Sequence, residues 1–250
     1  MSTHRRVLAL SCAVLGAAST LMGCNSGPAG TTLTVSAASS LTEAMSEIGQ
    51  RFEATHPGVS VRFNFGGSSA LAEQIASGAP VDVFASASLS ALQAAIDRLE
   101  APESMATNRM AVAVPASNPA GISSLDDLAR PGVTVVLCQE SVPCGAAAAS
   151  VLDNAGLTIT PASLEPDVKS VLAKVSADEA DAGIVYSTDI TAAAADVREI
   201  EIPADVNVTT TCVIAAVRDS AEAPLAAEFI QFVLGEQGRE VLLAAGFGPP

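Results

Sequence analysis

Four junctions in the chain combine a turn with the start of a helical pattern, and each could bind an anion. They span residues 37–43, 66–71, 142–146 and 165–169, and the first two carry adjacent serines. The first turn of a helix exposes backbone N–H groups at the positive end of the helix dipole, and both attract negative charge. Helix capping alone explains any single junction, and Ser40 with Glu43 fits a capping box. In parallel α/β sheets, however, such junctions gather at the carboxyl ends of the strands, where ligands bind.

Histidine, on which much catalytic and metal chemistry depends, is scarce in this chain. There are two, His4 and His56, and His4 lies in a segment that we expect to be cleaved. One remaining histidine is too few for a zinc site built from several histidines and leaves few arrangements for nucleophilic catalysis. A secreted hydrolase that uses Ser40 or Ser68 is a competing hypothesis, but neither serine lies in a Gly-x-Ser-x-Gly elbow. Both observations argue against an enzyme that depends on histidine.

The charge balance of the chain argues against two classes of partner. Its 250 residues include 27 acidic and 12 basic side chains, which gives a net charge of −15 at pH 7. Nucleic acid needs a basic face that displaces counterions from phosphates, and anionic lipid needs a polybasic patch, so neither is an expected partner. Hydrophobic residues make up 49% of the chain and aromatic residues only 3%. This composition predicts an ordered core built from aliphatic side chains.

The N-terminal residues are typical of an export signal that ends in a lipidation site. Two arginines precede an apolar stretch of small residues at 7–20, which is too short to span a bilayer comfortably. The following Leu-Met-Gly-Cys resembles the lipobox of bacterial lipoproteins, in which Cys24 would be lipidated and become the first residue. We therefore expect a signal peptide at 1–23, a tether at 24–30 and lipid anchoring outside the cytoplasmic membrane. An ordinary secretory signal cut nearby is the alternative.

Export permits disulfide bonds. Three cysteines remain once Cys12 and Cys24 are assigned to the signal and the lipid. Cys138 ends a strand-like run, and Cys144 follows six residues later across a turn that contains a proline. That separation permits a small closed loop, so we predict a Cys138–Cys144 disulfide, with two reduced thiols as the alternative. Cys212 lies in an apolar run and is predicted to be a buried free thiol.

Strand and helix patterns alternate along the rest of the chain. Strand patterns cover residues 32–37, 59–65, 81–85, 110–114, 133–137, 182–186, 197–202 and 209–217. Helical patterns cover residues 41–52, 71–76, 123–130, 145–155, 168–175, 222–234 and 236–245. The strand–helix–strand order implies parallel sheets with right-handed crossovers. We predict two α/β lobes, 31–112 with 214–250 and 113–213, and a single doubly wound sheet is the alternative.

Several motifs of the chain resemble those of the molybdate-binding proteins of bacterial ABC importers. Ala-Ala-Ser-Ser-Leu-Thr-Glu-Ala at 37–44 is similar to the opening motif of that family. Phe-Gly-Gly-Ser-Ser-Ala-Leu-Ala at 65–72, Gly-Ala-Pro-Val-Asp-Val-Phe-Ala-Ser-Ala at 78–87 and Gly-Ile-Val-Tyr at 183–186 are similar to later ones. The resemblance covers about residues 32–247. It implies the type II periplasmic binding fold, with two lobes, each a mostly parallel sheet flanked by helices, and two crossover strands as the hinge.

The resemblance also implies a binding protein rather than an enzyme, with no cofactor. Its ligand would be a tetrahedral oxyanion, molybdate or tungstate, held in the cleft between the lobes. The family holds its ligand with serine hydroxyls, backbone N–H groups and one tyrosine. Carried over by motif, the donors are the hydroxyls of Ser40, Ser68 and Tyr186 and the N–H groups of Cys144 and Val168. Ser39 and Ser69 are the neighbours that a shift of one residue would substitute. A small side chain is usual in the family where Cys144 stands, but a backbone contact does not depend on the side chain.

The expected donors suit the chemistry of the expected ligand. Molybdate is a dianion at neutral pH that offers only acceptors, so a shell of donors can hold it without a buried Arg or Lys. Lys169 is therefore expected to be solvated. The resemblance implies a monomer that delivers its ligand to the membrane permease of an ABC importer. A binding protein for another tetrahedral oxyanion such as sulfate, and a sensory or adhesive surface lipoprotein, are the alternatives.

Overall fold

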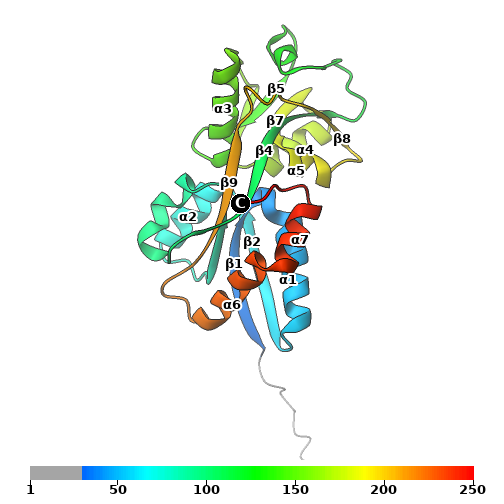
Figure 1. Cartoon of the computed structure of the whole chain (residues 1–250). Helices are drawn as coiled ribbons and strands as arrows, with labels where there is room; N and C mark the ends of the chain where they lie inside the picture. Colours follow the sequence, from blue (N-terminus) through cyan, green and yellow to red (C-terminus); the bar gives the residue numbers. More distant parts are fainter. Residues whose placement is uncertain (1–29) are drawn as a thin grey trace, which may run out of the picture.

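The structure is a computed structural model that describes residues 30–250, and these residues form two lobes (Figure 1). The predicted signal peptide, the lipidation site Cys24 and all but the last residue of the predicted tether lie outside the described residues. Within residues 30–250, no helix combines the length and the apolar character that a membrane span requires.

Lobe I contains the first three strands, the helical elements that follow each of them and the two C-terminal helices. Strand β1 lies between β2 and β3 and runs parallel to both. The strands are β1 (Thr31–Ala38), β2 (Val59–Gly66) and β3 (Val83–Ser86). The helical elements are η1 (Ser39–Leu41), α1 (Thr42–Thr55), α2 (Ser68–Ala76), η2 (Ser90–Arg98), α6 (Ala223–Leu234) and α7 (Glu236–Ala244). The chain therefore returns to lobe I after building lobe II, as the two-lobe prediction expects.

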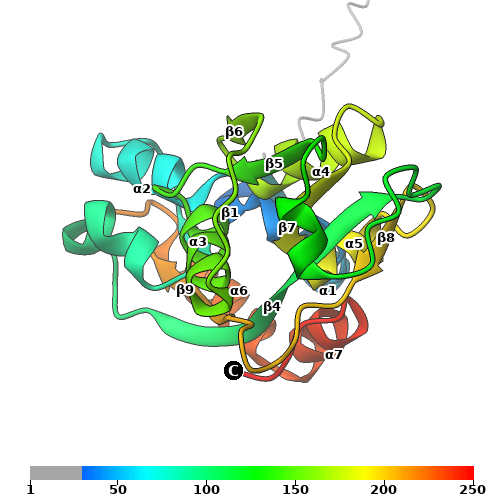
Figure 2. The same cartoon turned by 90° about the horizontal axis from the view of Figure 1, so that it is seen from above.

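Lobe II contains the middle of the chain. Strand β5 runs parallel to β6 and β7, and α3 lies on one side of these strands with α4 and α5 on the other (Figures 1 and 2). The strands are β5 (Val135–Cys138), β6 (Ser163–Glu165), β7 (Ala182–Tyr186) and β8 (Val197–Ile200). The helical elements are η3 (Leu125–Ala129), α3 (Pro143–Ala155), α4 (Val168–Ser176) and α5 (Ser187–Ala192).

Two long strands, β4 (Glu103–Pro115) and β9 (Thr209–Ala216), cross between the lobes. The first half of β4, to Arg109, pairs antiparallel with β9, which also pairs with β3 in lobe I. From Met110 onward, β4 pairs instead with β7 and β8 in lobe II. The nine strands therefore form one continuous path in the order β2-β1-β3-β9-β4-β7-β5-β6, with β8 beside β4. Its antiparallel pairs at β4 and β9 join the strands of the two lobes and distinguish it from a doubly wound parallel sheet.

The helices of lobe I are fixed by apolar side chains that recur on one face. In α1 the buried face includes Met45, Ile48 and Phe52, spaced three and four residues apart as an amphipathic helix requires. The ring of Phe52 meets that of Phe229 on α6 edge to face, with centroids 5.1 Å apart, and so ties the two helices together. This packing holds the N-terminus of α1 at the top of lobe I, where it faces lobe II.

Candidate functional site

The carboxyl ends of strands from both lobes enclose a small cavity. The turns after β1 and β2 contribute from lobe I, and those after β5, β6 and β7 contribute from lobe II. All five predicted donors line it: Ser40, Ser68, Cys144, Val168 and Tyr186. The cavity measures about 10 Å³, whereas sites for organic ligands typically measure about 300–1,000 Å³. It therefore suits a compact ion.

Two hydroxyl groups that line this cavity are buried without a partner. Among residues 30–250, neither Oγ of Ser40 nor Oη of Tyr186 has a hydrogen-bond partner, although the two residues are only 5% and 1% exposed. A buried polar group left unpaired costs roughly 1–3 kcal/mol, so native proteins rarely keep one without a reason. Burial raises the pKa of Tyr186 above its usual range, which keeps the phenol protonated as a donor. Both hydroxyls are therefore ready to donate to a ligand.

Ser68 is positioned by a bond that leaves its own proton free. Its Oγ accepts the backbone N–H of Ala87 at 3.1 Å, so the hydroxyl hydrogen remains available to the cavity. The neighbouring Ser69 points elsewhere and donates to the carbonyl of Ser141 at 2.7 Å. Of the second serine pair, therefore, only Ser68 lines the cavity. At the first pair both Ser39 and Ser40 line the cavity.

The two predicted backbone donors lie in the first turns of α3 and α4, where N–H groups have no acceptor within the helix. Helix α3 begins at Pro143, a residue suited to the first helical position, and Cys144 follows it. A side chain at Gly145 would place a Cβ 1.9 Å from the carbonyl oxygen of Gln139, so the loop before α3 folds tightly against the helix only with glycine there. In α4 the cap is Asp167, whose carboxylate accepts the N–H of Ser170 at 2.9 Å.

The disulfide that the spacing predicts is present in the structure. Cys138, the last residue of β5, is joined to Cys144, and their Cα atoms lie 5.8 Å apart. The bond spans the turn that presents the Cys144 N–H to the cavity. Cys212 is free and buried among the described cysteines, as predicted.

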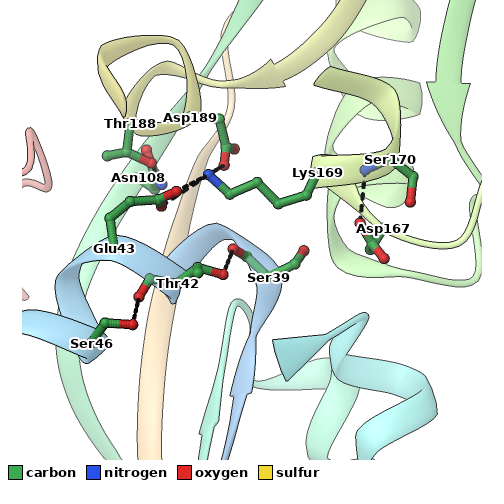
Figure 3. A network of polar contacts seen from close by, with 10 residues as sticks. All are labelled: Ser39, Thr42, Glu43, Ser46, Asn108, Asp167, Lys169, Ser170, Thr188 and Asp189. Atoms are coloured by element: carbon green, nitrogen blue, oxygen red, sulfur yellow. Dashed lines mark hydrogen bonds and ion pairs between the residues drawn. The ribbon is translucent and has the colours of Figure 1, made fainter. Parts of the chain in front are cut away.

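The capping box predicted for Ser40 and Glu43 is not formed. The 3₁₀ turn η1 precedes α1, and within the described residues neither element has a side-chain cap. Glu43 instead accepts hydrogen bonds from Nζ of Lys169 at 2.8 and 2.9 Å (Figure 3). In the contact with Lys169 both partners are charged and both carboxylate oxygens accept, whereas a capping bond would join the carboxylate to one neutral N–H. The expectation that Lys169 is solvated is also wrong.

Lys169 has a second partner in Asp189, which the sequence analysis missed. The Oδ1 atom of Asp189 lies 3.2 Å from Nζ of Lys169, and the Asp189 side chain is fully buried. Burial raises the pKa of Asp189 to about 6, against the opposing effect of the Lys169 charge. The two residues are twenty positions apart on different helices, and no spacing rule relates them.

A second cavity shares Ser40 with the first but has a different lining. It measures about 240 Å³ and lies between α1, α5 and α7. Glu43 and Glu47 are among its walls, and these carboxylates disfavour an anion. Of the two cavities, the small one is therefore the better anion site.

Residues 30–250 form neither a histidine-activated serine nor a cluster of metal ligands. The only histidine among these residues is His56, which caps the C-terminus of α1, the end of the helix away from the cavity. Its ring stacks on Phe52, and its Nε2 atom lies 3.6 Å from the Glu228 carboxylate. It therefore cannot activate Ser40 or Ser68 as the hydrolase hypothesis requires. Within residues 30–250 there is also no group of three His, Cys, Asp or Glu side chains that could hold a metal ion.

Two α/β lobes that enclose an ion-sized cavity beside two crossing strands define a periplasmic binding protein of the type II fold. A family model described as bacterial extracellular solute-binding protein matches residues 33–248. The molybdate-binding protein ModA of Mycobacterium tuberculosis is 40% identical over 233 residues, which cover 90% of this chain and 89% of the relative. The chain belongs to the bacterial extracellular solute-binding proteins and, within them, to the family of ModA.

Two solved structures show the same fold at lower identity. The periplasmic molybdate-binding protein of Azotobacter vinelandii aligns with a TM-score of 0.76 at 22% identity, over 87% of this chain and 99% of that one. The sulfate-binding protein SubI of Mycobacterium tuberculosis aligns with a TM-score of 0.77 at 19% identity, over 88% and 87% of the two chains. The predicted fold class is therefore confirmed.

Proposed function

We propose that this protein binds molybdate, and tungstate with it, in the small cavity and delivers the ion to the membrane permease of an ABC importer. The observation that carries the proposal is the pair of buried, unpartnered hydroxyls of Ser40 and Tyr186 on a cavity of ionic size. The 40% identity to ModA supports molybdate as the ligand. Tungstate matches molybdate in charge and nearly in size, so the same donors would hold it.

The donor set favours a fully ionised oxyanion. Ser40, Ser68 and Tyr186 would each give one hydroxyl hydrogen, and the first turns of α3 and α4 would give the N–H groups of Cys144 and Val168. The one carboxylate that lines the cavity, that of Asp167, already accepts from Ser170. Molybdate and sulfate carry no proton at neutral pH, whereas hydrogen phosphate carries one that needs an acceptor. Binding without catalysis is the role that this arrangement supports.

The proposed assembly follows from the expected processing of the chain. The two lobes, 31–112 with 214–250 and 113–213, would close on the ion as a monomer. Cleavage before Cys24 and its lipidation would hold the protein on the outer side of the cytoplasmic membrane, beside the permease. Incorporation of labelled palmitate into the wild-type chain and its loss in Cys24→Ala tests the anchor.

Ligand-induced thermal shift tests the proposed ligand. A ligand that binds only the folded state stabilises it by RT ln(1 + [L]/Kd), about 4 kcal/mol at 1,000 times Kd. Millimolar molybdate and tungstate should raise the melting temperature strongly, and phosphate should leave it unchanged. A larger shift with sulfate than with molybdate would reassign the ligand to sulfate. No shift with any of the four anions would refute oxyanion binding.

A further inference from the structure

The Glu43–Lys169 ion pair crosses the cleft at the edge of the anion cavity. Glu43 belongs to α1 of lobe I, three residues after Ser40, and Lys169 belongs to α4 of lobe II, directly after Val168. Neither side chain is among the described residues that line the small cavity. Figure 3 shows the extended Lys169 side chain reaching from α4 to the carboxylate of Glu43. The pair therefore bridges the lobes beside the small cavity without lining it.

The two partners of Lys169 have different environments. Asp189 lies in lobe II with Lys169, and its side chain is fully buried. This contact lies within one lobe, so it persists when the lobes separate. The Glu43 side chain is 53% exposed even while it contacts Lys169, so water can solvate it once the lobes part. Asp189 thus holds the ammonium group in place, and the bond to Glu43 forms only on closure.

The charges make this arrangement useful to an anion-binding site. A carboxylate at the edge of the cavity repels a bound dianion through a medium of reduced dielectric. When the lobes come together, the Lys169 ammonium lies 2.8 Å from the Glu43 carboxylate and offsets part of its charge, because it also faces Asp189. Closure therefore weakens this repulsion and adds a bond between the lobes.

We propose that Glu43 and Lys169 form a latch that closes over the bound ion and slows its release. The proposal deepens the proposed function, because the latch acts at the same cleft. Lys169 is a positioning residue in this scheme, and the ligand is held by other donors. The latch predicts an effect on the dissociation rate, since the pair is absent while the ion enters the open cleft.

Glu43→Gln and Glu47→Gln form a matched pair of variants. Glu47 lies one turn further along α1, and its bond to Arg51 at 2.7 Å stays within the helix. Release of radiolabelled molybdate is followed after a chase with unlabelled ion. Glu43→Gln should speed release about 3- to 10-fold, since a partly exposed ion pair is worth roughly 1 kcal/mol and tenfold is 1.4 kcal/mol. The association rate should not fall, because the variant removes a negative charge at the cleft, and Glu47→Gln should release at the wild-type rate.

A measurement without ligand separates the latch from the proposed function. Glu73 on α2 and Ser150 on α3 are both exposed and can be replaced by cysteines that carry spin labels. Double electron–electron resonance between the two labels reports the separation of the lobes. Glu43→Gln should shift the ligand-free distances toward the open range relative to Glu47→Gln, and 1 M salt should remove the difference by screening. Failure of the wild type to bind any oxyanion would refute the proposed function, and the ligand-free distances would still decide the latch. Equal release rates and equal distances in the two variants would overturn the latch.

Discussion

The backbone N–H of Ala87 donates to Oγ of Ser68 at 3.1 Å, and this bond fixes which way the serine can donate. Since this bond uses only the oxygen, the hydroxyl hydrogen stays free to donate into the cavity that Ser68 lines. Ser68→Ala should therefore weaken molybdate binding by about 1.5–3 kcal/mol, the range for a bond to a charged acceptor. That is about 10- to 150-fold in Kd, measured by titration calorimetry. The variant should also lose about 1 kcal/mol of stability, because the Ala87 N–H is left unpaired.

Ser69→Ala is the matched control for this prediction. Ser69 donates to the Ser141 carbonyl across the cleft and does not line the cavity. Its loss should weaken binding by less than about tenfold, since a neutral hydrogen bond is worth about 1 kcal/mol net. A larger loss for Ser69→Ala than for Ser68→Ala would show that the assignment of the second serine is shifted by one residue.

Removal of an unpartnered hydroxyl should affect binding and stability in different ways. Tyr186→Phe and Ser40→Ala each remove a donor to the ligand, and each should weaken molybdate binding about 10- to 150-fold. Neither hydroxyl has a partner among the described residues, so the ligand-free melting temperature should stay equal or rise. Calorimetric melting with and without molybdate measures both effects. A fall in the ligand-free melting temperature of several degrees would mean that these hydroxyls are structural.

The approach of the lobes should depend on a glycine. A Cβ on Gly67 would lie 2.5 Å from the carbonyl oxygen of Pro166 in lobe II, whereas a Cβ on Gly66 would meet only Leu71 at 3.6 Å. Gly67 has φ −63°, so alanine fits its backbone and the clash arises only on closure. Gly67→Ala should therefore weaken molybdate binding at least about tenfold, the effect of 1.4 kcal/mol, with little change in ligand-free stability. Gly66→Ala should bind as the wild type in the same titration.

Much of the fold could be predicted because its strands are apolar runs that end in turns. The pattern at residues 182–186 matches β7, and those at 59–65 and 209–217 differ from β2 and β9 by one residue. By contrast, only residues 110–114 of β4 were predicted. The first part of that strand, Glu103–Arg109, is largely polar and is extended because β9 pairs with it. The three-residue β6 likewise depends on β5 and has too few residues to show a period.

The candidate site could be predicted only where its residues belong to motifs. Ser40, Ser68 and Tyr186 stand in recognisable motifs, and the structure brings them to one cavity. The contacts of Lys169 could not be predicted, because Glu43 is 126 residues away and Asp189 lies on another helix. The capping box failed for the same reason, since its local pattern ignores a stronger partner that only the tertiary fold supplies.

The buried Asp189 should make stability depend on pH with an unusual sign. Burial raises its pKa from 3.8 to about 6, so between these values the folded protein binds more protons at this carboxyl than the unfolded chain. Its contribution to stability therefore falls as the pH rises from 4 to 7, by on the order of 3 kcal/mol. Its charged neighbours oppose each other, because the Lys169 charge lowers the pKa of Asp189 and the Glu43 charge raises it. Burial raises the pKa of Cys212 to about 12 and that of Tyr186 still higher, so neither titrates.

Asp189→Asn isolates this effect. The variant keeps the shape of the side chain and removes the titration, so other carboxylates contribute equally to both proteins. Urea unfolding of the two proteins at several pH values gives the difference in free energy of unfolding. We expect wild type minus variant to decrease as the pH rises from 4 to 7. An increase over that range would mean that Asp189 is stabilised as a charge, with a lowered pKa.

A crystal of the protein with molybdate, measured at the molybdenum absorption edge, tests the central claim most directly. The account predicts one anomalous peak inside the small cavity, with ligand oxygens about 2.5–3.2 Å from Ser40 Oγ, Ser68 Oγ and Tyr186 Oη. The Cys144 and Val168 N–H groups should point to the same ion. An empty small cavity, with the ion in the larger one beside Glu43 and Glu47 or absent altogether, would contradict it.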